Sequence, residues 1–148
     1  MLYLQHDDWS PRYQDTFYTV RLEQFELLAS APVATSNLPA NHLGSKTSFP
    51  AYYYKIEVFC GRHAPRTVFR RYSQFKWLYE NIPNEALCLP PAGGCFCTPQ
   101  TENFARNRTM DLMEFLEEAL ARREIASHDI VAQFLELGAF ETAAGTSS

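Results

Sequence analysis

The sequence has no long apolar segment. No run of hydrophobic residues approaches the ~18–20 that a membrane-spanning helix needs. The first ten residues, which include Asp7 and Asp8, lack the basic start and apolar block of a secretory signal. We therefore expect a soluble, cytoplasmic protein. Its 148 residues, of which 46% are hydrophobic and 14% aromatic, are enough for one folded domain with one core.

Positive charge is also scarce. The chain has 13 Lys and Arg against 17 Asp and Glu, which gives a net charge of −4, and no lysine follows Lys76. This balance argues against broad nucleic-acid binding, which needs a positive surface. It argues equally against attachment to acidic membranes by charge alone. Any recognition of an anion must therefore come from a local basic site.

Motifs for catalysis and for metal binding are missing. The two-residue spacing of a zinc site does not occur among the four cysteines, Cys60, Cys88, Cys95 and Cys97. We interpret them as reduced structural thiols, and a zinc site that adds His63 is the alternative. No Cys–His pair lies in a catalytic signature, and Gly93-Gly94 is too short for a nucleotide-binding loop. We expect no enzyme, no cofactor and no metal.

The first half of the chain has the pattern of β-strands. Alternating apolar and polar residues predict strands over residues 17–28, 51–59 and 66–72. The turn residues of Gly61 to Pro65 predict that the last two strands form a hairpin. Residues 29–50 are rich in Ala, Ser, Pro and Asn, which predicts a long surface loop.

The second half has the pattern of helices. Ser73 is predicted to cap the first one. A segment rich in proline and glycine, residues 87–100, precedes the longest one, residues 104–120. The last is predicted to begin after Ser127 and to end at Gly138. Strands followed by helices predict an α+β fold, in which a small three-stranded antiparallel sheet packs on a helical layer and a proline-rich loop precedes the long helix.

Four short motifs, in this order, resemble those of the phox-homology (PX) domain. Phe69–Phe75 is similar to the basic–aromatic motif that closes the third strand of the family, and Leu89–Pro91 to the start of its proline-rich membrane loop. Phe104–Leu116 is similar to the start of its long helix, and Phe134–Glu136 to its last helix. The resemblance implies a PX-like domain over residues 16–138, with 29–50 as a long loop. An irregular leader, 1–15, and a flexible tail, 139–148, would flank it.

The family binds phosphoinositides, most often phosphatidylinositol 3-phosphate on endosomes. By position, the resemblance implies that Arg71 grips the 3-phosphate and that Arg108 binds the hydroxyls of the inositol ring. Tyr72 would pack beneath that ring, although core packing is its alternative role. Arg70 and Arg106 are further candidates for phosphoinositide binding. Guanidinium suits this task because it offers a planar fork of donors and stays charged.

A second element is expected to touch the membrane. Pro90–Pro91 and Phe96 are the candidate insertion residues, and packing of Phe96 into the core is the alternative. Many family members carry a lysine after the two prolines, which meets the 1-phosphate. Residues 92–94 of this chain are Ala, Gly and Gly instead. Arg106 and Arg62 are the candidates to replace that lysine.

The resemblance therefore implies a peripheral membrane module for endosomal or vesicular trafficking or sorting. Its partners would be a phosphoinositide head group, the membrane surface and proteins of a sorting complex, with no nucleic acid. The missing lysine and the acidic balance favour an alternative, a protein-interaction module on the same fold whose lipid pocket has degraded. A cysteine-based metal-binding protein is the third reading.

Overall fold

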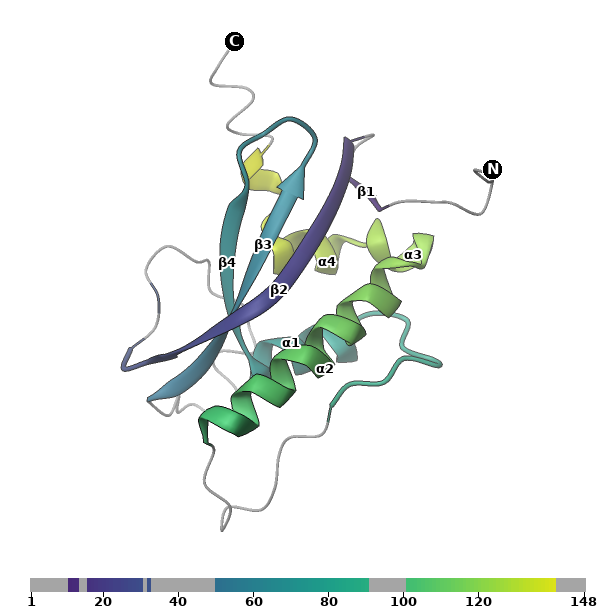
Figure 1. Ribbon diagram of the computed structural model, residues 1–148. Coiled ribbons are helices and arrows are strands. Elements are labelled where there is room, and N and C mark those ends of the chain that lie inside the picture. The colour runs from purple at the N-terminus through teal and green to yellow at the C-terminus, as the bar shows by residue number, and fades with distance from the viewer. Residues whose placement is uncertain (1–10, 14–15, 31, 33–49, 91–100, 141–148) are drawn as a thin grey trace, which may run out of the picture.

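A computed structural model of the protein describes residues 11–13, 16–30, 32, 50–90 and 101–140. Within these ranges an antiparallel sheet packs by one face on a layer of helices (Figure 1). The predicted α+β class is confirmed, although the sheet has four strands in the order β1-β2-β3-β4. The strands are β1 Arg12–Tyr13, β2 Thr16–Leu28, β3 Ala51–Cys60 and β4 Arg66–Arg71.

The strand that the sequence did not predict is β1, which lies in the expected irregular leader and pairs with β2 over two residues. The predicted hairpin is present, since β3 and β4 pair from Tyr53↔Arg71 to Val58↔Arg66. Gly61 opens its turn with φ +56°, and a Cβ at this position would stand 2.8 Å from a methyl carbon of Thr16. Glycine is therefore the residue that suits this turn.

The helical layer follows the sheet in the chain. Its helices are α1 Tyr72–Glu80, α2 Glu102–Leu120, α3 Arg123–Ala126 and α4 Asp129–Leu135. The longest, α2, packs lengthwise along β2 (Figure 1). Its buried positions recur at helical spacing, as at Leu112, Phe115, Leu116 and Ala119. The thiol of Cys60 and the side chain of Phe134 belong to the same core.

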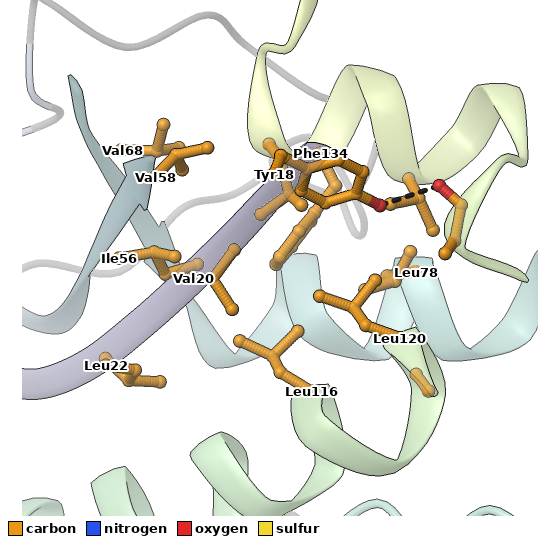
Figure 2. Close-up of a cluster of buried hydrophobic side chains, with 14 of the residues drawn as sticks. Tyr18, Val20, Leu22, Ile56, Val58, Val68, Leu78, Leu116, Leu120 and Phe134 are labelled. Atoms are coloured by element: carbon orange, nitrogen blue, oxygen red, sulfur yellow. Dashed lines mark hydrogen bonds between the residues drawn. The ribbon is translucent and has the colours of Figure 1, made fainter. Parts of the chain in front are cut away.

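One buried hydrogen bond fastens the sheet to the end of the helical layer. The Tyr18 hydroxyl on β2 donates to the carbonyl oxygen of Ala126 at the end of α3, over 2.6 Å (Figure 2). The bond is buried, and Tyr18 belongs to the same hydrophobic core as Leu78, Leu120 and Phe134 (Figure 2). Burial raises the pKa of the Tyr18 phenol, so the group stays a neutral donor.

A β-bulge in β2 changes which of its side chains face the helices. Leu22 pairs with Ile56 and Gln24 with Lys55, so β2 contains one extra residue at this point. Side chains alternate between the two faces of a strand, and one extra residue reverses the alternation. Beyond the bulge Phe25 pairs with Tyr54, and the odd-numbered residues of β2 share the face that the even-numbered ones occupy before it.

The C-terminal boundary differs from the expected one. The last helix ends at Leu135 rather than at Gly138, with Glu136 in the left-handed region at φ 55°. Phe140 is only 3% exposed and packs against the His63 ring, with 5.6 Å between ring centroids. The domain therefore extends at least to Phe140, into the segment predicted to be a flexible tail. Residues 141–148 lie outside the described ranges.

Candidate functional site

The junction between β4 and α1 presents the two residues at the centre of the basic–aromatic motif. Arg71 ends the strand and is the N-cap of the helix, with φ −95° and ψ 170°. Its backbone N–H donates to the side-chain oxygen of Gln74 over 2.9 Å. Ser73 is therefore inside the first helical turn and is not the predicted cap. The positive end of the α1 dipole lies beside Arg71, which favours an anion there.

A hollow of about 190 Å³ opens at this junction. It is lined by Ala51, Tyr52, Tyr54, Arg71, Tyr72, Ser73 and Arg108. The structure thus brings together Arg71 from a strand end, Tyr72 from a helix start and Arg108 from α2. These are the three residues that the family resemblance pointed to, and they are separated by up to 37 positions in the chain. The hollow is cationic, with aromatic walls.

Aromatic rings hold the Arg108 guanidinium in place. Its central carbon lies 4.1 Å from the centroid of the Tyr72 ring and 4.5 Å from that of Phe104. The side chain is only 6% exposed, so water screens its charge weakly. Burial raises the pKa of the neighbouring Tyr54 phenol to about 12, although the Arg108 charge acts in the opposite direction. A fixed, desolvated cation of this kind interacts strongly with an anion that enters the hollow.

Tyr72 connects the hollow to the proline-rich segment. Its hydroxyl donates to the carbonyl oxygen of Pro90 over 2.5 Å. Burial raises the pKa of this phenol, and the Arg108 charge partly opposes the shift. Tyr72 is half-buried and lies outside the main hydrophobic core, so it is a wall of the hollow rather than a core residue.

Unlike Arg71, Arg70 is buried and bonded within the domain. It is 0% exposed, its Nε donates to the carbonyl oxygen of Phe134 over 2.9 Å, and its Nη2 lies 3.2 Å from a Glu136 carboxylate oxygen. Burial lowers the pKa of this guanidinium to about 10, and Glu136 counteracts the shift. The expectation that Arg70 could bind the head group is therefore corrected: this guanidinium binds α4 and is inaccessible to a ligand.

The other expected basic residues lie away from the hollow. Arg106 is exposed, forms a 3.0 Å ion pair with Glu102, and is absent from the lining. Arg62 is in the β3–β4 turn, at the far end of a strand that rises about 16 Å before it reaches Arg71. It therefore cannot replace the missing lysine. Pro90 is at the edge of the site, whereas Pro91 and Phe96 lie outside the described residues.

The described start of the proline-rich segment has acidic neighbours. Cys88, Leu89 and Pro90 line a second hollow, of about 240 Å³, together with side chains of α2. These are Asp111, Glu114, Phe115 and Glu118. Three carboxylates thus border the segment at the point where the family resemblance leads us to expect a membrane-contacting loop. A negative lipid surface would be repelled there.

Sequence reasoning missed the aromatic contribution of β3. Tyr52 and Tyr54 line the hollow because they pair across the sheet with the ends of β2 and β4. The run of three tyrosines at the start of a strand was the available signal. The described part of the chain contains no cluster of three side chains able to bind a metal, and Cys60 and Cys88 are free thiols. Arginine, tyrosine and serine around one hollow suit anion binding.

The model of the PX domain family matches residues 60–137, which is just over half of the chain. The chain belongs to the PX domain family. Among solved structures, a designed CISK-PX domain determined by X-ray matches with a TM-score of 0.54 and 22% sequence identity. The match covers 79% of this chain and 97% of the designed domain, and at this identity it supports the fold alone. No curated protein matches the sequence.

Membership of this family makes the chain a phosphoinositide-binding, membrane-targeting module of the peripheral kind. Family members are lipid-binding modules rather than enzymes. Every helix in the described ranges is too short or too polar to cross a bilayer.

Proposed function

We propose that this PX domain binds phosphatidylinositol 3-phosphate and attaches a trafficking or sorting protein to endosomal membranes. One observation carries the proposal: Arg71 and Arg108, from distant parts of the chain, line the same small hollow. In this proposal Arg71 binds the 3-phosphate, Arg108 binds the ring hydroxyls, and Tyr72 is the wall against which the inositol ring packs. Proteins of a sorting complex are the proposed partners.

The position of Arg71 suits a phosphomonoester. Its planar fork can form two charge-assisted hydrogen bonds to phosphate oxygens, and the start of α1 adds partial positive charge at the same place. The side chain is half-buried, so a phosphate that binds it is partly shielded from water and salt. A strand end and a helix cap hold its backbone, which lowers the entropy that binding must remove.

The small number of cations in the hollow favours a head group with one ring phosphate. Among the residues that the structure describes, two guanidiniums and no lysine line it. Arg108 is already stacked on Tyr72 and Phe104, which leaves Arg71 as the main phosphate ligand. A second or third ring phosphate would find little compensating charge in the hollow. This supports a monophosphorylated lipid over polyphosphorylated ones.

The test is vesicle pelleting against a panel of phosphoinositides, with Arg71→Gln as the variant and Arg62→Gln as the matched control. Each substitution removes one guanidinium from the same hairpin, but only Arg71 reaches the hollow. We expect strongest binding to phosphatidylinositol 3-phosphate. Arg71→Gln should weaken it by roughly 10- to 100-fold, because a charge-assisted hydrogen bond contributes about 1.5–3 kcal/mol. Arg62→Gln should bind like the wild type.

Two results would contradict the proposal. The first is equal binding of the wild type to vesicles with and without phosphoinositide. The second is unchanged binding by Arg71→Gln. A folded protein that binds no phosphoinositide would support the alternative function, a protein-interaction module on the PX fold.

A further inference from the structure

Three large hydrophobic side chains of the described residues are strongly exposed, and one of them borders the cationic hollow. They are Phe17, Leu27 and Met110. Leu27, which is 52% exposed, pairs across the sheet with Tyr52, and Tyr52 lines the hollow. Phe17 lies at the opposite end of the same strand. Because Leu27 lies beside the hollow, its exposed side chain is a candidate contact surface next to the ligand site.

The apolar surface around Leu27 is continuous with the wall of the hollow. The Phe25 ring meets the Tyr52 ring edge-on, with 5.7 Å between their centroids. The β-bulge places Phe25 and Leu27 on the same face as Tyr52 and Tyr54, whereas a regular strand would turn them away. We call Phe25, Leu27 and Tyr52 the apolar lip.

The charges beside the lip suit an anionic lipid surface better than the described start of the proline-rich segment does. The Arg106 guanidinium lies 6.0 Å from the centroid of the Phe25 ring and is more than half exposed, although Glu102 pairs with it. The proline-rich segment begins instead among Asp111, Glu114 and Glu118. Of these two borders of the hollow, the lip combines exposed hydrocarbon with the Arg106–Glu102 ion pair, which has no net charge, whereas the other combines proline with three carboxylates.

We propose that the apolar lip is a membrane-contact element, in which Leu27 enters the interfacial layer of an anionic membrane while the adjacent hollow holds a phosphoinositide head group. This inference rests on the proposed function, because the lipid in the hollow brings the lip to the bilayer. A peripheral protein needs two weak signals for stable but reversible attachment. The lip supplies the apolar signal here, and the missing loop lysine is then no obstacle to attachment.

The chain contains its own control for this inference. Phe17 is 55% exposed, nearly the same fraction as Leu27, and lies on the same strand about 30 Å away. Leu27→Gln and Phe17→Gln therefore remove similar exposed hydrocarbon at the two ends of β2. Both variants should unfold at the wild-type temperature within a few degrees, because neither side chain is in the core.

The experiment compares two ligands for each protein. One is vesicles of phosphatidylcholine and phosphatidylserine with a few per cent phosphatidylinositol 3-phosphate, measured by pelleting. The other is soluble short-chain phosphatidylinositol 3-phosphate, measured by titration calorimetry. We expect Leu27→Gln to bind the vesicles about tenfold more weakly and the soluble lipid equally well. Phe17→Gln should match the wild type with both ligands.

The outcomes separate this inference from the proposed function. Wild-type vesicle affinity in Leu27→Gln, or equal losses in both variants, would overturn the role of the lip while leaving the head-group site intact. The wild type could also sediment as a dimer that Leu27→Gln, but not Phe17→Gln, dissociates. That result would overturn the membrane role of the lip in favour of a contact between copies of the chain. Failure of the wild type to bind the soluble lipid would overturn both proposals.

Discussion

The same substitution at two adjacent arginines, Arg70 and Arg71, should affect different properties of this PX domain: stability at Arg70 and phosphoinositide binding at Arg71. Arg70→Met is expected to destabilise the fold by about 3–5 kcal/mol, because it removes one partner of a buried ion pair. Arg71→Met should change the free energy of unfolding by less than about 1 kcal/mol, because that side chain faces the hollow. The second variant should instead lose phosphoinositide binding.

The magnitude for Arg70 follows from what its guanidinium touches. Its loss leaves the carbonyl oxygen of Phe134 without the 2.9 Å hydrogen bond from Nε and removes the 3.2 Å contact to Glu136. Glu136 keeps the 2.9 Å ion pair with Arg66, so its charge is not left isolated, and the lower end of the range is expected. For a chain of this length, 3 kcal/mol corresponds to a fall in Tm of roughly 10 °C.

The assay is urea and thermal unfolding of the wild type, Arg70→Met, Arg70→Lys and Arg71→Met. Arg70→Lys keeps the charge but loses the planar fork, so its stability should lie between those of the wild type and Arg70→Met. Each variant is also titrated with soluble phosphatidylinositol 3-phosphate. The reasoning would be refuted if Arg70→Met unfolded within 1 kcal/mol of the wild type, or if Arg71→Met proved the less stable of the two.

Two further predictions concern tyrosines. Tyr18→Phe should lower the free energy of unfolding by about 1–2 kcal/mol, because it leaves the buried Ala126 carbonyl unpaired, and urea midpoints at neutral pH check this. Burial raises the pKa of Tyr54 from 10.0 to about 12, so the folded state retains a proton that the unfolded chain releases. The contribution of Tyr54 to the free energy of unfolding is complete below pH 10 and is lost as the pH rises toward 12. At pH 11 the loss is about 1 kcal/mol. Tyr54→Phe should flatten this decline between about pH 10 and 11, and identical slopes for the two proteins would contradict the assignment.

Local patterns in the sequence were sufficient to predict much of the fold. The alternation at the start of β3 and the apolar face of α2 identified the two elements that carry most of the core. The short elements were missed. β1 has two residues and α3 has four, too few for any periodicity to appear, and both form because larger elements provide contacts for them.

The site was predictable in part. The error at Arg70 is explained by the alternation of side chains between the two faces of a strand. Arg71, Tyr72 and Arg108 follow from the motifs, but Arg70 was listed beside them as a further candidate. Val68 and Arg70 are two positions apart on β4, so a buried valine already indicated that Arg70 points inward. The lip could not be predicted in the same way, because the bulge beside Gln24 reverses the alternation on which such reasoning depends.

The corner at which β4 becomes α1 contains no loop, since the last residue of the strand directly precedes the first residue of the helix. The backbone of Arg71 is thus held between a strand and a helix, so only its side chain can adjust to a ligand. The junction therefore presents Arg71 to a ligand from a fixed backbone position. With the backbone fixed, lipid affinity is tuned by the Arg71 side chain and by its surroundings, namely the aromatic walls, the charges at the rim and the strength of contact with the bilayer.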